Sequence, residues 1–434
     1  MIAGGFFLII LAGTLLLMLP FATKSGEHTS FLTALFTSAS ATCVTGLIVA
    51  DTFTHWTLFG QIVLLVLIQI GGLGFITIGI TVSMLLRRKI GLRERGLIQE
   101  SFNVIELRGM VRLTKRVITG TLFFEGAGAC ILAACFIPDM GLAQGFYYGM
   151  FHSVSAFCNA GFDLMGRYEA FSSLTSYYSH PVVVITIVLL IVIGGIGFIV
   201  WSDLYDHGLH FRKYSLHTKI VLTSTLALIL GSTLVFYCLE QNRLFAEMDF
   251  TGKLLSSLFC AVTPRTAGFN TTDVGSLSDA GKLFTVVLMF IGGAPGSTAG
   301  GVKVTSIVVL FVYIKANLTR TVGYNIFGRR LEDEALRKAA AVFCTNLTLA
   351  MTAVIILCGI SDLNGIDVLV EVFSAISTVG MSAGLTTKLN TPSLLIVILL
   401  MYLGRVGSLS FAMSFTDKKK IAHVMQPSEK INIG

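Results

Sequence analysis

The chain has 434 residues, of which 54% are hydrophobic and only 13% are charged. Because an average soluble domain is about one-quarter charged, this composition excludes an ordinary soluble enzyme. The net charge of +7 is not arranged as a nucleic-acid-binding surface, because most Lys and Arg residues gather in a few segments between long apolar runs. We therefore expect an all-α polytopic membrane protein and no nucleic-acid partner.

The basic segments predict the orientation of the chain in the membrane. Lys and Arg accumulate on the cytoplasmic side of membrane proteins, so each basic segment is expected to face the cytoplasm. Eight spans with both termini in the cytoplasm satisfy this pattern. The first apolar run, 2–19, has neither a basic flank nor a small-residue cleavage site, so we expect a retained helix rather than a signal peptide. The basic segments are 87–116, 212–219, 315–338 and 418–430.

Four consecutive units share one predicted order of elements: a spanning helix, a pore half-helix, a loop and a second spanning helix. The units are 1–100, 101–212, 213–330 and 331–434, the last with a basic tail. The spanning helices are expected at 2–19 and 56–86, from 117 onward and at 182–205, at 220–239 and 282–312, and at 339–360 and 393–415. The half-helices, each about a dozen residues and too short to span, are expected at 29–41, 144–156, 252–263 and 366–378.

The loop after each half-helix ends in a small residue, a glycine and a bulky apolar residue. Non-helical backbone at membrane depth is tolerated only where protein buries it or where it lines a water-filled cavity. A fourfold repeat of such a loop predicts one central pore, as in a potassium channel. The copies are SASATCVTGL (38–47), SVSAFCNAGF (153–162), CAVTPRTAGF (260–269) and ISTVGMSAGL (376–385), which align Gly46, Gly161, Gly268 and Gly384.

These loops have the properties of an ion filter. A dehydrated cation can be coordinated by rings of backbone carbonyls, and glycine permits the backbone angles that aim them at one axis. The residues before each glycine differ among the copies, so the backbone is the expected ligand. The negative C-terminal end of each half-helix favours cations. Predicted ion-binding residues are Val44, Thr45, Gly46, Asn159, Ala160, Gly161, Thr266, Ala267, Gly268, Ser382, Ala383 and Gly384.

A second repeated column lies in the closing helix of each unit. Its copies are Ile70–Gly74, Ile193–Gly197, Ile291–Pro295 and Leu403–Gly407. Small residues at this depth can simply permit close helix packing, but Arg405 occupies the column that holds glycine in the other three units. A charge in an apolar helix usually faces a cavity or a partner. We expect Arg405 to form an electrostatic barrier below the filter; a snorkelling arginine is the alternative.

The third closing helix is expected to be broken in its middle. Five glycines and one proline in GGAPGSTAGGVK, residues 292–303, cannot continue a helix smoothly. This segment is a predicted gate, with Lys303 or Arg405 holding it; a kinked helix or a short cytoplasmic turn is the alternative. Its residues are Gly292, Gly293, Ala294, Pro295, Gly296, Ser297, Thr298, Ala299, Gly300 and Gly301.

Other polar residues give weaker signals. Cys43 and Cys158 share a column with Arg265 and Met381, which excludes a four-thiolate metal site. No nucleophile–base set or phosphate-binding loop is recognised, so we expect neither an enzyme nor an organic cofactor. Glu125, within an apolar helix, is expected to pair with a neighbouring helix. Three further residues near the outer loops are expected to be solvated: His152, Asp163 and His180.

Four degenerate pore loops, a broken third closing helix and an arginine in the last one resemble the Trk/Ktr/HKT superfamily of potassium transporters over essentially the whole chain. The start at the first unit, without two additional helices, is similar to the Ktr type. The resemblance implies a filter at Gly46, Gly161, Gly268 and Gly384, and glycine at Gly46 favours K⁺ as the transported ion.

The resemblance also implies partners and a location. They are a homodimer with one pore per protomer, membrane lipid, a cytosolic RCK-type (KtrA-like) nucleotide-binding regulatory subunit, and the bacterial cell membrane. Several Ktr systems depend on Na⁺, so Na⁺ is a second candidate ion. The alternative function is an alternating-access cation symporter, although such proteins usually show a twofold inverted repeat.

Overall fold

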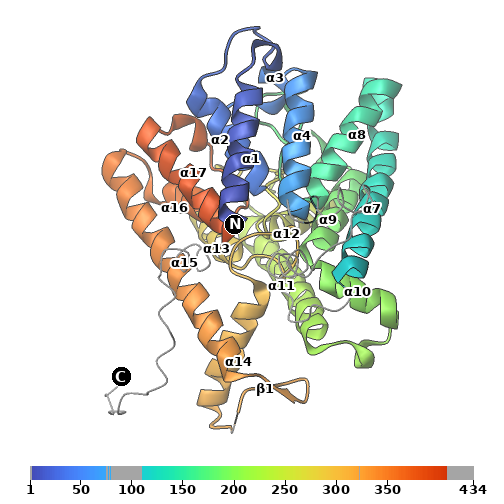
Figure 1. Cartoon of the computed structure of the whole chain (residues 1–434), viewed down its shortest axis with the longest axis vertical. Coiled ribbons are helices and arrows are strands. Elements are labelled where there is room, and N and C mark those ends of the chain that lie inside the picture. Colours follow the sequence, from blue (N-terminus) through green and yellow to red (C-terminus); the bar gives the residue numbers. More distant parts are fainter. Residues whose placement is uncertain (1, 75–76, 78, 80–109, 322, 408–434) are drawn as a thin grey trace.

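The fold is almost entirely helical (Figure 1). A computed structural model of the chain describes residues 2–74, 77, 79, 110–321 and 323–407. Most of the first predicted basic segment and the whole predicted basic tail lie outside the described residues. The two units at the start of the chain contain α1 (Ile2–Leu17), α2 (Phe31–Cys43), α3 (Thr52–His55), α4 (Leu58–Leu73), α7 (Met110–Met140), α8 (Leu142–Phe157), α9 (Pro181–Gly195) and α10 (Phe198–His207).

The second half of the chain repeats the order of long and short helices. Its helices are α11 (Leu216–Glu240), α12 (Phe250–Val262), α13 (Asp279–Phe290), α14 (Val304–Leu318), α15 (Asp333–Ile360), α16 (Gly365–Ile376) and α17 (Thr391–Val406). A hairpin of β1 (Asn325–Ile326) and β2 (Arg329–Arg330) joins α14 to α15. Short 3₁₀ turns lie at Pro20–Ala22, Met165–Arg167, Thr175–Tyr177, Phe211–Lys213 and Thr386–Lys388.

The short helix of each unit begins at a defined residue. The side chains of Ser30, Asp249 and Asn364 cap α2, α12 and α16 by accepting hydrogen bonds from backbone N–H groups in the first turn. Such caps satisfy donors that have no partner within the helix. Gly141 begins α8 without a side-chain cap. Three of the four short helices therefore start at a polar residue that interrupts the apolar sequence, and the fourth starts at a glycine.

The units close into a ring through one repeated packing contact. The closing helix of each unit packs against the short helix of the next: α4 on α8, α9 on α12 and α13 on α16. The last closing helix, α17, packs on α2 of the first unit. The four loops after the short helices consequently converge inside the molecule.

The longer helices have the properties of membrane spans. Among the described residues, α7, α11 and α15 are each long and apolar enough to cross a bilayer, and α9 with α10 passes the same test as a bent pair. Along α11, the outward residues Leu226, Leu230 and Leu234 are about 60% exposed at four-residue spacing, which gives an apolar face that suits lipid. A helical membrane protein is thus confirmed, while eight spans stay a prediction.

The second closing helix differs from the single helix expected at 182–205. It bends by 95° between α9 and α10. Gly197 adopts φ +93° at the bend, and the Phe198 N–H donates to the carbonyl of Gly296, 2.8 Å away in a distant segment. A tertiary hydrogen bond thus replaces a helical one, which sequence periodicity does not reveal.

Candidate functional site

The four loops share a backbone signature just after each short helix. A non-glycine residue adopts positive φ: 58° at Val44, 59° at Asn159, 70° at Thr266 and 51° at Thr378. Such angles are unusual for β-branched residues and cost about 1–3 kcal/mol each, so the surrounding structure must hold them. A glycine with positive φ follows two residues later in every loop: Gly46, Gly161, Gly268 and Gly380.

These four glycines form a closed ring. A Cβ built on each one would collide with the backbone carbonyl of the next loop, which shows how closely the loops meet. The colliding pairs run once around the ring: Gly46 with Ala160, Gly161 with Ala267 at 2.8 Å, Gly268 with Val379 at 2.5 Å, and Gly380 with Thr45. Any side chain at these positions would therefore push the loops apart.

The expected position of the fourth loop is wrong by four residues. Gly380, not Gly384, belongs to the ring, because a Cβ at Gly384 would have no neighbour within 4 Å. Ser382 and Ala383 likewise follow the ring rather than precede its glycine. The fourth loop carries two glycines four residues apart, and the small–glycine–apolar pattern matches the second one. The ring residues in this loop are Thr378, Val379 and Gly380.

A different sequence signal identifies the correct glycine. Ser-Ala precedes the ring glycine by six and five residues in three loops, at Ser40, Ser155 and Ser374. The Ser40 and Ser374 hydroxyls accept hydrogen bonds from the N–H groups of Gly46 and Gly380, both at 3.0 Å. The corrected alignment also puts Ser377, rather than Met381, in the column of Cys43, Cys158 and Arg265.

Hydroxyls of the other two short helices hold their loops through carbonyls. Ser155 Oγ donates to the carbonyl of Phe162 over 2.7 Å. Thr263 Oγ1 donates to the carbonyl of Phe269. All four loops are thus fixed to the preceding short helix or its end by a buried side-chain hydroxyl, so their backbone positions are set locally as well as by the ring.

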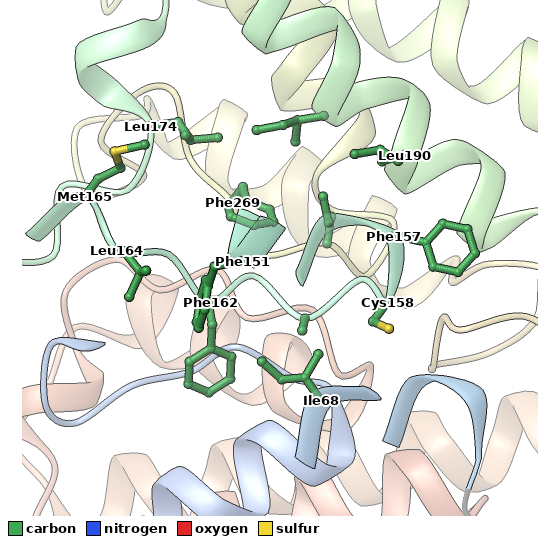
Figure 2. Close-up of a cluster of buried hydrophobic side chains, with 14 of the residues drawn as sticks. Ile68, Phe151, Phe157, Cys158, Phe162, Leu164, Met165, Leu174, Leu190 and Phe269 are labelled. Carbon is green, nitrogen blue, oxygen red and sulfur yellow. The ribbon is translucent and has the colours of Figure 1, made fainter. Parts of the chain in front are cut away.

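Apolar packing supports the loops from behind. Figure 2 shows Phe162 and Phe269, which follow the ring glycines of the second and third loops, within one buried cluster. The same cluster includes Phe151 of α8, Ile68 of α4 and Leu190 of α9. Side chains from three units therefore clamp these loops, and water is excluded from their outer surface.

Glycines of the closing helices allow those helices to touch the ring. A Cβ at Gly71, Gly194 or Gly404 would collide with the carbonyl oxygen of the residue four positions before a ring glycine. The residues contacted are Thr42, Phe157 and Ile376. In the third unit, Gly292 instead meets the carbonyl of Gly300 within its own broken helix. The second predicted column is therefore a close-packing column, except in the third unit and at Arg405.

The segment 291–303 interrupts the third closing helix as expected. Its ends pair: the Gly292 N–H donates to the Val302 carbonyl at 2.8 Å, and the Val304 N–H donates to the Gly293 carbonyl at 3.1 Å. Between these ends the chain forms a compact loop. Neither a smooth kink nor a simple turn between two spans describes this arrangement.

The loop lies against the short-helix side of the ring. Thr298 Oγ1 donates to the Phe157 carbonyl over 3.2 Å, and the Ala294 N–H donates to the Gly195 carbonyl over 2.9 Å. A Cβ at Gly300 would collide with the side chain of Thr378. The loop therefore contacts the base of the second and fourth pore loops directly.

Arg405 joins this loop to the first unit. Its guanidinium donates to the carbonyl of Thr298 and to those of Gly71 and Gly72, the last at 3.2 Å. The two glycine carbonyls belong to the last turn of α4, where carbonyls lack partners within the helix. Lys303 Nζ donates to the carbonyls of Ala299 and Gly300 within the loop, over 2.7 and 3.3 Å. Both cations thus bind carbonyls rather than carboxylates.

Four further polar residues confirm or correct the sequence expectations. Glu125 accepts hydrogen bonds from Gln69 Nε2 of α4, 3.1 and 3.3 Å from its two carboxylate oxygens, so its predicted interhelical pair is confirmed. His152 and Asp163 are buried, so their expected solvation is wrong. His180 is exposed, as expected.

A ring of backbone loops inside a helical membrane protein, with a broken helix and two half-buried cationic side chains bound to carbonyls beside it, is typical of a transport protein rather than an enzyme. Comparison with known proteins agrees with this class. Residues 6–424 match the family model described as TrkH, cation transport protein. The chain belongs to this family of non-enzymatic cation transporters, which confirms the resemblance deduced from the loops.

The sequence is similar to those of two curated relatives over nearly their whole length. The chain is 40% identical over 435 residues to Ktr system potassium uptake protein B of Bacillus subtilis, with 100% of this chain and 96% of the relative covered. It is 38% identical over 441 residues to the potassium/sodium uptake protein NtpJ of Enterococcus hirae, with the same coverage. The crystal structure of the potassium transporter TrkH from Vibrio parahaemolyticus has the same fold, with TM-score 0.73, 19% identity, and 96% of this chain and 85% of that chain covered.

Proposed function

We propose that the protein takes up K⁺ through one pore formed by its four units, each contributing one filter loop. The ring formed by Gly46, Gly161, Gly268 and Gly380 carries this proposal, because four backbone segments approach one another without any ionisable side chain at the contact. Backbone carbonyls arranged in this way replace the hydration shell of a monovalent cation. The names of the relatives, a potassium uptake protein and a potassium/sodium uptake protein, agree with K⁺ as the ion.

The gate of this pore is the loop of residues 292–301, held by Lys303 and Arg405. Its hydrogen bonds to Phe157 and Gly195 lie at the base of the filter loops. A guanidinium at the same level repels cations, because charges inside a membrane protein are only weakly screened. Movement of this loop away from the filter base opens the pathway.

Regulation and assembly are further parts of the proposal. The Bacillus subtilis relative is named as a component of a Ktr system, which suggests a second subunit. We assign a homodimer in the bacterial cell membrane, with both termini cytoplasmic, and an RCK-type nucleotide-binding subunit on the cytoplasmic face. Na⁺ is a second ion, since the Enterococcus hirae relative is named for both potassium and sodium.

Growth rescue tests the proposed function. The full-length chain is expressed in bacteria that lack their own K⁺ uptake systems, with and without a co-expressed RCK subunit and with and without added Na⁺. Growth at limiting K⁺ is the expected result. Failure to grow under all four conditions, with the protein present in the membrane, contradicts K⁺ uptake.

A further inference from the structure

The short helices carry a distinctive residue nine positions before each ring glycine. In the second and fourth loops the side chain at this position holds the segment that follows the ring. The four residues are Thr37, His152, Phe259 and Glu371, all essentially buried. These four side chains differ widely in polarity and charge. The residues that bind the ring backbone, in contrast, all carry a hydroxyl group.

Glu371 is bound to the fourth loop by two hydroxyl groups. Ser382 Oγ donates to Glu371 Oε2 over 2.7 Å, and Thr386 Oγ1 donates to Oε1. Glu371 has no exposed surface. Among the described residues, its carboxylate forms no ion pair with Lys, Arg or His within 4 Å. The carboxylate therefore uses both of its oxygens to bind this loop.

Ser382 passes this restraint on to the backbone. Its Oγ accepts the N–H groups of Gly384 and Leu385, at 3.1 and 3.2 Å. The same helix fixes the ring through Ser374 Oγ and the Gly380 N–H. The segment between Gly380 and Thr386 is thus tied to α16 at both ends.

The other loops show that this carboxylate is special to the fourth unit. His152 accepts the Leu164 N–H through Nε2 at 3.3 Å, which is a single neutral contact. Thr37 donates to its own helix, at the Thr33 carbonyl, over 2.8 Å. Phe259 offers no polar group. Of these four positions, all of which the structure describes, only the one in the fourth loop supplies an acceptor with two oxygens that binds two hydroxyl donors.

We propose that Glu371 is a positioning residue that sets ion selectivity by fixing the outer part of the fourth loop. This inference rests on the proposed function and names one residue through which the filter is held. Selection between K⁺ and Na⁺ requires carbonyls that cannot close around the smaller ion or change their number. Loss of the carboxylate releases the segment after Gly380, so the Val379 carbonyl in the ring is held less firmly and adapts to Na⁺.

Glu371→Gln tests this role with the smallest change of shape. The amide keeps one acceptor and replaces the other with an NH₂ donor, so one of the two hydroxyls can no longer donate to residue 371 and its hydrogen bond has to reverse direction. In proteoliposomes containing the purified protein, the ratio of K⁺ to Na⁺ uptake is expected to fall about tenfold, the effect expected from weakening one hydrogen bond to a charged group. Ser382→Ala is expected to act in the same direction, and the double variant is expected to fall little further, because both changes break one network.

Asp367→Asn is the matched control. Asp367 lies one turn earlier on α16 and pairs with Lys282 Nζ at 2.9 Å, away from the loop. This variant removes a carboxylate from the same helix, and its K⁺ to Na⁺ ratio is expected to equal that of the wild type. An equal loss of selectivity in both variants overturns the inference, because it indicates general damage to α16.

The remaining outcomes also decide the question. A wild-type ratio in Glu371→Gln overturns the positioning role while leaving the proposed function intact. A wild-type protein that does not discriminate K⁺ from Na⁺ overturns the proposed function and the inference with it. If Glu371→Gln does not insert, Thr386→Val removes one donor at constant shape, and an unchanged ratio in that variant and in Ser382→Ala overturns the inference.

Discussion

Gly380 and Gly384 lie four residues apart and have similar backbone angles, φ 93° and 80°, but only one of them lacks room for a side chain. Asparagine tolerates positive φ better than most residues, so it separates steric from conformational effects. Gly380→Asn is expected to lower K⁺ uptake at least about tenfold, because its side chain collides with the first loop at Thr45. Uptake into proteoliposomes measures the loss.

The control is Gly384→Asn, which places the same side chain in open space. This variant is expected to retain most of the wild-type uptake and its K⁺ selectivity. Equal loss in the two variants would contradict the assignment of Gly380 to the ring. Loss in Gly384→Asn alone would restore the alignment expected from the small–glycine–apolar pattern.

In the proposed pathway Arg405 has two roles: its charge repels cations, and its guanidinium donates hydrogen bonds to backbone carbonyls. Arg405→Ala removes a cation that repels K⁺ and releases the loop at Thr298. The rate of K⁺ uptake is therefore expected to rise severalfold, which corresponds to a barrier lower by about 1 kcal/mol. Tracer uptake by the purified protein gives this rate.

Arg405→Lys is the corresponding control, because lysine keeps the charge but not the planar fork of donors. Its uptake rate is expected to lie between those of the wild type and Arg405→Ala. If alanine leaves the rate unchanged in correctly inserted protein, Arg405 has no part in limiting cation passage.

At the scale of elements, the broken third closing helix contains the loop that we propose as the gate. Deletion of residues 294–298 removes the contacts with Phe157 and Gly195 and one partner of Arg405. Basal K⁺ flux without any regulatory subunit is expected to increase, because the segment beneath the filter is lost. Normal membrane insertion together with loss of flux would show that the loop supports the pathway rather than blocking it.

The order of elements was predictable from the sequence because apolar length and glycine-rich breaks are local signals. Half-helices of about a dozen residues were expected and α2, α8, α12 and α16 are found. The 95° bend before α10 was not predictable, since it depends on a hydrogen bond from Phe198 to distant Gly296.

The hydrogen-bond partners of side chains within the site could not be predicted from the sequence either. The alignment of the fourth loop failed because Gly384 satisfies the same three-residue pattern as the ring glycines. Glu371 was missed because its partners follow it by eleven and fifteen residues, across the ring. Arg405 was found because a charge in an apolar helix is conspicuous, yet its carbonyl ligands come from two other units.

At the scale of the molecule, one chain builds a closed ring from four unequal units. Each closing helix packs against the next short helix, and α17 completes the ring on α2 (Figure 1). Because the units are not identical, the gate loop, Arg405 and Glu371 each occur once around the axis. A pore of four identical chains must repeat every such feature four times. The asymmetry of this chain therefore agrees with the proposal that one unit supplies a gate while all four units contribute to the filter.

Selective flux through the purified protein tests the central claim most directly. The wild-type chain in proteoliposomes is assayed for K⁺ and Na⁺ uptake at equal concentrations, with empty liposomes and Gly380→Asn as controls. The proposed filter predicts K⁺ uptake at least about tenfold faster than Na⁺ uptake, and loss of this K⁺ flux in Gly380→Asn. Equal rates for the two ions in the wild type, or K⁺ flux that survives Gly380→Asn, would contradict a K⁺ filter formed by the four-glycine ring.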